Sequence, residues 1–142
     1  MSAGWLLFLI WLALQVFSVW RRRKQGPPPP PGGRVKAVHN EEEWKEHQKT
    51  AALADSKLLV VDFSATWCPP CRAITPFYEA LSEKYPQATF VKVDVDEAKG
   101  VAGSCGVRAM PTFHLYKAGK LVEQWAGADE RRLEAATAKW VQ

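Results

Sequence analysis

The chain has 142 residues, three of them cysteines, and a formal net charge of +4 at pH 7. This length allows one domain with an ordinary hydrophobic core and a short additional segment. The sequence Arg-Arg-Arg-Lys at 21–24 supplies the whole excess, because the other 15 of the 19 basic side chains balance the 15 acidic ones. With the charge confined to this cluster, binding of the folded part to nucleic acid is disfavoured.

The N-terminal segment is an apolar run that begins at Trp5 and ends at Trp20, interrupted only by Gln15 and Ser18. With the two residues before it, the run comprises about 18 residues, or about 27 Å as a helix, which just crosses a thin bilayer. Tryptophan at both ends suits the headgroup region. A cleaved signal peptide is the alternative, although no basic side chain precedes the run and the residues around Trp20 make a poor cleavage site. We predict that residues 1–24 are an uncleaved transmembrane anchor with a basic flank.

The basic cluster at 21–24 also predicts the orientation of this anchor. Cytoplasmic flanks of membrane spans carry an excess of lysine and arginine, so the C-terminal side should lie in the cytosol. The same cluster is suited to binding anionic lipid headgroups. The predicted protein is therefore a single-pass membrane protein whose folded domain, residues 35–142, faces the cytosol.

A segment rich in proline and glycine, residues 25–34, follows the anchor. Its five consecutive prolines at 27–31 favour the polyproline II conformation, which makes an extended spacer of roughly 16 Å. A ligand for an SH3 or WW domain is the alternative interpretation of such a run. We predict a stiff linker that precedes a domain formed by residues 35–142.

Strand and helix patterns alternate from residue 35 onward. Val35–Val38 predicts a short strand, and Asn40 with Glu43 resembles a capping box that starts a helix running to about Ala54. The run Leu58–Ser64 is apolar except at one position, which is typical of a strand covered on both faces of a sheet.

The later elements are a helix at 71–85, a strand at 89–95, a short helix at 97–105, a hairpin of strands at 112–116 and 121–125, and a final helix at 129–140. The order βαβαβαββα predicts an α/β domain with a central mixed sheet flanked by helices.

Cys68 and Cys71 lie where the strand at 58–64 is followed by a helix, and they are separated by Pro69 and Pro70. Unpaired amides and the positive end of the macrodipole at a helix N-terminus favour a thiolate, so we expect Cys68 to be the nucleophile. Cys71, one turn into the helix and less accessible to solvent, suits a resolving role. The pair predicts dithiol–disulfide redox chemistry.

Other interpretations of the pair are weaker. Structural zinc needs four ligands. The remaining candidate ligands form no second pair: Cys105, His39, His47 and His114. A purely structural disulfide would close a loop too small to stabilise the fold much. We expect Cys105 to be a free buried thiol, with regulatory oxidation or intermolecular pairing as alternatives, and the histidines to have no catalytic role.

Asp62 is the carboxylate within the apolar strand. An ionised carboxylate in a dry interior costs several kcal/mol, so its pKa should rise until it can hold a proton near neutrality. The alternative is a position at the strand end where the carboxylate stays hydrated.

The motif Trp67-Cys68-Pro69-Pro70-Cys71, preceded by Val61-Asp62-Phe63 and followed by Pro76 and Met110-Pro111-Thr112, resembles the thioredoxin family. The resemblance extends from about Val35 to the C-terminus and implies the thioredoxin fold. It also implies that Asp62 takes the proton of Cys71, directly or through water, and that Lys92 lies near Asp62.

The resemblance further implies that Pro111 is a cis-proline that faces the cysteines and leaves the backbone of the preceding residue free to pair with a target peptide. The implied target groove is mostly apolar: Trp67, Pro70, Ala109, Met110, Pro111, Ala126 and Gly127.

Pro69 departs from the family, in which Gly-Pro commonly separates the two cysteines. Proline has no amide hydrogen and stiffens the loop. We therefore expect a slightly higher pKa for Cys68 than in a Pro69→Gly variant.

The resulting hypothesis is a membrane-tethered protein-disulfide reductase that forms the redox disulfide Cys68–Cys71 in each cycle. No bound cofactor or metal is expected. The resemblance implies a separate, NADPH-dependent thioredoxin reductase as electron donor, since the chain has no Gly-rich dinucleotide loop. The expected partners are disulfide-containing proteins and this reductase, and not nucleic acid. The alternatives are a lumenal disulfide oxidase or isomerase, which needs a different topology, and a non-catalytic binding module.

Overall fold

The computed structural model describes residues 4, 5, 7–13, 15, 34–53 and 57–142. The strands are β1 (Val35–Val38), β2 (Leu58–Ser64), β3 (Thr89–Asp94), β4 (Thr112–Lys117) and β5 (Lys120–Ala126). The helices are α2 (Glu41–Leu53), α3 (Pro69–Lys84), α4 (Lys99–Ser104) and α5 (Glu130–Trp140). The order of these elements is the one predicted from the sequence.

Two helices begin two residues away from the predicted start. α3 begins at Pro69 instead of Cys71, because a proline at the first helical position has the required φ and lacks an amide that would be unpaired there. α4 is shorter than the predicted helix at 97–105, since Asp94 accepts the amides of Asp96 and Glu97 and forms a turn before it.

The five strands form one mixed sheet in the order β1-β3-β2-β4-β5. β1 and β2 both run parallel to β3, whereas β4 pairs antiparallel with β2 and with β5. β2 thus has a neighbour on each side, and all of its residues are buried. The mixed sheet predicted from the continuous apolar pattern is confirmed.

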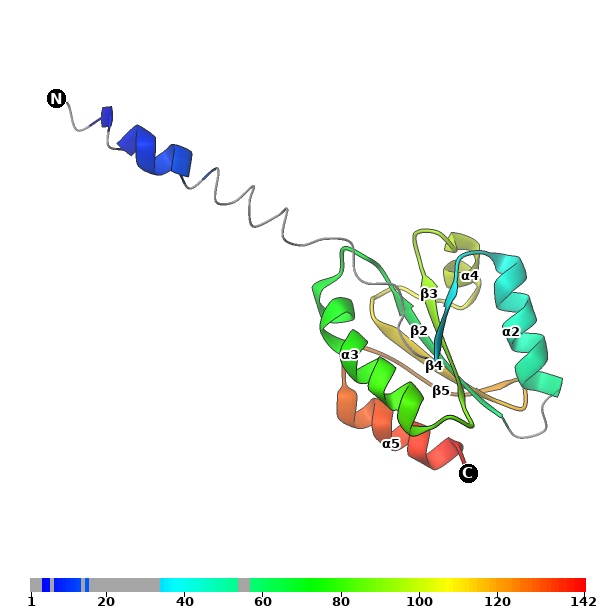
Figure 1. Cartoon of the computed structure of the whole chain (residues 1–142). Helices are drawn as coiled ribbons and strands as arrows, with labels where there is room; N and C mark the ends of the chain where they lie inside the picture. Colours follow the sequence, from blue (N-terminus) through cyan, green and yellow to red (C-terminus); the bar gives the residue numbers. More distant parts are fainter. Residues whose placement is uncertain (1–3, 6, 14, 16–33, 54–56) are drawn as a thin grey trace.

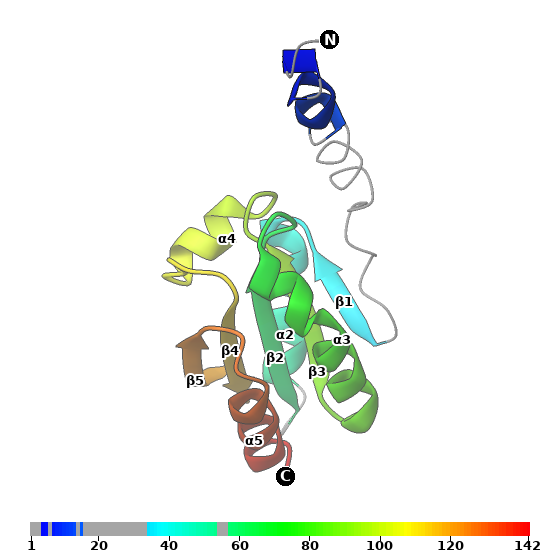
Figure 2. The ribbon, with the colours of Figure 1, turned by 90° about the vertical axis from the view of Figure 1, so that its left-hand side faces the viewer.

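Helices cover both faces of the sheet, with α3 and α5 on one face and α2 and α4 on the other (Figures 1 and 2). Side chains alternate along β2, so Leu58 and Val60 join the core beneath α3, whereas Leu59 and Val61 join the core beneath α2. The same alternation directs Asp62 to the face covered by α3.

Residues 4, 5, 7–13 and 15 are helical. The other residues of the predicted anchor, the basic cluster at 21–24 and most of the predicted linker lie outside the described residues. In the part of the chain that the structure describes, no helix has the length and apolar character needed to cross a membrane.

Candidate active site

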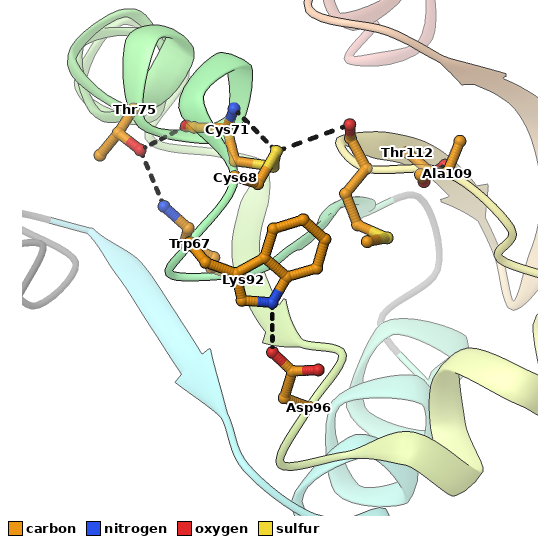
Figure 3. The surroundings of a disulfide bond; sticks show 9 residues. Trp67, Cys68, Cys71, Thr75, Lys92, Asp96, Ala109 and Thr112 are labelled. Carbon is orange, nitrogen blue, oxygen red and sulfur yellow. Dashed lines mark hydrogen bonds between the residues drawn. A yellow bond between two sulfur atoms is a disulfide. The ribbon is translucent and has the colours of Figure 1, made fainter.

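Cys68 and Cys71 are joined by a disulfide at the start of α3, next to the carboxyl end of β2. Cys68 is the N-cap residue, and the amide of Cys71 donates to its sulfur at 3.3 Å (Figure 3). Cys68 is 4% exposed and Cys71 is 1% exposed, so the order of accessibility agrees with the prediction although both are buried in this oxidised state.

The local sequence determines which amide reaches the Cys68 sulfur. Pro69 and Pro70 occupy the first two helical positions and have no amide hydrogen, so the first free N–H of α3 belongs to Cys71. This N–H and the positive end of the helix dipole are directed at Cys68. Both would stabilise a negative charge on that sulfur after reduction.

The loop before β4 lies against the disulfide. The Met110–Pro111 peptide bond is cis, as the resemblance implied. The carbonyl oxygen of Met110 lies 3.6 Å from the Cys68 sulfur. The amide of Gly127 donates to the carbonyl oxygen of Pro111 at 2.8 Å, which brings the end of β5 next to this loop.

The residues of the predicted target groove therefore come from neighbouring segments. Met110 is half-buried and Pro111 is buried. The others are exposed: Trp67, Pro70, Ala109, Ala126 and Gly127. The Trp67 ring is 61% exposed and is fixed by a hydrogen bond from Nε1 to Asp96 Oδ2 at 2.8 Å (Figure 3). The result is an exposed aromatic surface beside a reactive disulfide.

Asp62 is completely buried on β2, and neither carboxylate oxygen has a hydrogen-bond partner among the described residues. Burial raises its pKa to about 7, although the positive charge of Lys92 acts in the opposite direction. The hydrated strand-end alternative is therefore excluded. A carboxyl group with this pKa exchanges protons readily near neutral pH.

Lys92 lies opposite Asp62 on the adjacent strand β3, as the resemblance implied. Its ammonium group does not pair directly with the carboxylate. Instead, Nζ donates a hydrogen bond to Thr75 Oγ1 at 2.8 Å.

Sequence reasoning did not identify two further polar residues near the site. Thr75 Oγ1 donates to the carbonyl oxygen of Cys71 at 2.9 Å, and its four-residue spacing from Cys71 was the available signal. The Tyr78 hydroxyl lies 3.0 Å from the carbonyl oxygen of Val60 and 2.7 Å from that of Val91. Tyr78 resembles an ordinary member of the apolar stripe of α3, so its polar role had no clear sequence signal.

The other candidate residues lie apart from the disulfide. Cys105 is free as expected, but half-buried where full burial was expected, and burial raises the pKa of its thiol. His114 packs on Phe63 on the opposite face of the sheet, and His39 contacts Glu97 at the surface. No group of three or more metal-ligating side chains is found within the described ranges.

A disulfide at a helix N-terminus, with a wholly buried carboxyl group on the adjoining strand, is typical of dithiol oxidoreductases. A thioredoxin family model matches residues 35–139. Thioredoxin from Mus musculus is 44% identical over 106 residues, which are 75% of this chain and 98% of that protein. Thioredoxin H-type 2 from Nicotiana tabacum is 47% identical over 107 residues, 75% of this chain and 90% of that protein.

Solved structures that resemble this chain also include thioredoxins. The crystal structure of thioredoxin NaTrxh from Nicotiana alata has a TM-score of 0.75 and 44% sequence identity, and the match covers 82% of this chain and 100% of that chain. The chain therefore belongs to the thioredoxin family, and it is a protein-disulfide reductase of the thioredoxin type.

The prediction of a single-pass membrane protein with a cytosolic catalytic domain is wrong. No described helix can cross a membrane, and the match to the domain covers 98% of the mouse protein and 100% of the Nicotiana alata chain. The prediction depended on an apolar run of about 18 residues, which is at the lower limit for a transmembrane helix.

Proposed function

We propose that the protein reduces disulfides of other proteins through Cys68 as nucleophile, Cys71 as resolving thiol and Asp62 as proton acceptor. The observation that carries the proposal is the arrangement around the disulfide. The Cys68 sulfur accepts the first free amide of α3, and a wholly buried Asp62 with a pKa of about 7 lies on the adjoining strand.

In the first step, the reduced Cys68 thiolate attacks one sulfur of a target disulfide. A bond forms between Cys68 and that sulfur, the target S–S bond breaks, and the other target sulfur leaves as a thiolate. The amide of Cys71 and the positive end of α3 stabilise the attacking thiolate.

In the second step, Cys71 resolves the mixed disulfide. Its thiol gives a proton to the Asp62 carboxylate, and the resulting thiolate attacks the Cys68 sulfur. The bond between Cys68 and the target breaks, the second target sulfur leaves as a thiolate, and the Cys68–Cys71 disulfide forms. The target thus gains two electrons, and the two cysteines lose them.

The target peptide binds in an extended conformation along the groove formed by Trp67, Pro70, Ala109, Met110, Pro111, Ala126 and Gly127. The exposed Trp67 side chain and the position of the Met110 carbonyl oxygen, 3.6 Å from the Cys68 sulfur, favour a sequence-tolerant, strand-like mode of recognition. Loop-borne disulfides and those of partly unfolded proteins fit such a surface.

Electrons for the next cycle come from a thioredoxin reductase that draws on NADPH, and the protein holds no cofactor of its own. Residues 35–142 form the catalytic domain. The positive charge of Lys92 lowers the pKa of the Asp62 carboxyl group. Pro69 raises the pKa of the Cys68 thiol, because proline has no amide hydrogen to donate to the sulfur.

A coupled assay tests the proposal: NADPH oxidation is followed with thioredoxin reductase and insulin as the disulfide substrate. We expect Cys68→Ser and Cys71→Ser to reduce turnover to the uncatalysed background, because each variant lacks one of the two exchange steps. Cys105→Ser is the matched control and keeps its activity, since Cys105 packs against the core beneath α2 and the bonded cysteines belong to a different cluster. Turnover that survives Cys68→Ser contradicts the proposal.

A further inference from the structure

Thr75 connects the active-site helix to Lys92. It lies one turn after Cys71 on α3, and its side chain is half-buried. Its hydroxyl donates to the carbonyl oxygen of Cys71 at 2.9 Å and accepts from Lys92 Nζ at 2.8 Å (Figure 3). A hydroxyl has one donor and two acceptor sites, whereas an ammonium can only donate, so the two bonds are compatible in this direction.

The Lys92 ammonium is thereby held near Asp62 without contacting it. Asp62 and Lys92 are register partners on β2 and β3, so both side chains lie on the face covered by α3. The positive charge of Lys92 lowers the pKa of Asp62, which means that the ammonium acts within range of the carboxylate. Neither carboxylate oxygen, however, has a hydrogen-bond partner in the described part of the chain.

Among the residues that the structure describes, the other groups around Asp62 do not carry a compensating charge. From α3, the Tyr78 hydroxyl bonds to two main-chain carbonyls, and the charge of Asp62 raises the pKa of Tyr78. Cys71 in the first turn of this helix and the N-cap residue Cys68 are joined by the disulfide and carry no charge. β4 presents the apolar Phe113 opposite Asp62, and α5 contributes Leu133 to the same core. The position of the Lys92 ammonium therefore determines how strongly a positive charge favours the ionised form of Asp62.

We propose that Thr75 is a positioning residue, whose hydroxyl holds the Lys92 ammonium near the Asp62 carboxylate instead of in solvent. The inference rests on the proposed function, because Asp62 is the proton acceptor of that reaction. A direct ion pair would keep the carboxylate ionised and make it a weak base. Without a nearby cation, the carboxyl group would stay protonated and could not accept the proton of Cys71.

The first test compares Thr75→Val with Thr75→Ser in the oxidised full chain, by NMR titration of the carbon-13-labelled Asp62 carboxyl group. Valine has nearly the same shape as threonine but no hydroxyl, so the half-buried Lys92 side chain should extend toward water. We expect the pKa of Asp62 to rise by about one unit in Thr75→Val, because a nearby opposite charge lowers a carboxyl pKa by about 1–3 units. Thr75→Ser should titrate like the wild type.

Two further single variants and one double variant make the test specific. Thr75→Ala also lacks the hydroxyl and should give the same shift as Thr75→Val. Lys92→Met should raise the pKa of Asp62 by at least as much. If Thr75 acts through Lys92, adding Thr75→Val to Lys92→Met should cause no further shift.

Several results would overturn the inference. An unchanged pKa in both hydroxyl-free variants would remove the positioning role, and a further shift in the double variant would mean that Thr75 acts independently of Lys92. A lowered pKa would mean that the hydroxyl keeps the ammonium away from the carboxylate. Insulin reduction by the wild-type preparation tests the proposed function separately, because the titration still gives a result if the wild type is inactive.

Discussion

Replacing Asp62 by asparagine should change how the stability of the protein depends on pH. The carboxyl group is fully buried, and burial raises its pKa from an ordinary value of 3.8 to about 7. At a pH between 3.8 and about 7, the Asp62 carboxyl group has lost its proton in the unfolded chain but keeps it in the native protein. Since the native state binds more protons in this window, its free energy of unfolding falls as the pH rises.

The size of the effect follows from the shift in pKa. A difference of about 3 units, at about 1.36 kcal/mol per unit, corresponds to about 4 kcal/mol between pH 4 and pH 8. Asparagine has nearly the same shape as aspartate but does not titrate. The free energy of unfolding of Asp62→Asn, relative to the wild type, should therefore increase by about this amount over the same interval.

Urea unfolding of the oxidised proteins, followed by circular dichroism at one-unit intervals from pH 4 to pH 8, measures this difference. Glu46→Gln is the control, because it removes an exposed carboxylate from α2. The reasoning is refuted if the curves of free energy against pH for the wild type and Asp62→Asn are parallel. A wild type that gains stability relative to Asp62→Asn as the pH rises would mean that the native protein favours the ionised carboxylate.

Three further substitutions test individual contacts. Pro69→Gly should lower the pKa of the reduced Cys68 thiol, because a second amide becomes available near the sulfur. Thiolate absorbance measured against pH tests this, and a higher pKa in the variant than in the wild type would contradict it. Tyr78→Phe removes a buried hydroxyl and should lower the free energy of unfolding by about 1–2 kcal/mol in urea, whereas unchanged stability would show that its two hydrogen bonds contribute nothing. Gly119→Ala should destabilise by about 1–2 kcal/mol in thermal unfolding, since φ is +76° and a new Cβ would lie 3.0 Å from a neighbouring Cβ. Gly103→Ala, which meets nothing within 4 Å on α4, is the control for it, and equal losses in both variants would reject the conformational argument.

The sequence contained most of the information about the fold. The continuous apolar run of β2 predicted a central strand, and its alternation directs Asp62 to the face covered by α3. The exact start of α3 was missed because helical spacing of apolar residues begins only after Cys71. The two prolines before Cys71 suit the first turn of a helix, and they occupy it in the structure.

The candidate site was predictable where it depends on neighbours in the chain. The spacing of Cys68 and Cys71 at the end of a strand predicted a sulfur at a helix N-terminus, and the structure has that arrangement. The link from Lys92 to Thr75 was not predictable, because it depends on how α3 lies across β3. Packing of whole elements determines such contacts, and a local pattern does not contain this information.

The N-terminal segment was the main error. An apolar run flanked by basic residues has the composition of a membrane anchor, but composition alone does not establish that a helix spans a bilayer. Among the described residues no helix is long and apolar enough to do so. The family match, in contrast, depends on the domain from residue 35 onward.

The most direct test of the dithiol mechanism is the intact mass of trapped complexes. Reduced Cys71→Ser and Cys68→Ser variants, both carrying Cys105→Ser, are incubated with a protein that contains one accessible disulfide. If Cys68 is the nucleophile, Cys71→Ser should accumulate a mixed disulfide at the summed mass of the two proteins, because this variant lacks the thiol that would resolve it. Cys68→Ser should form none, because it lacks the attacking thiol. A complex that forms equally well through Cys71, or none with either variant, would contradict the account.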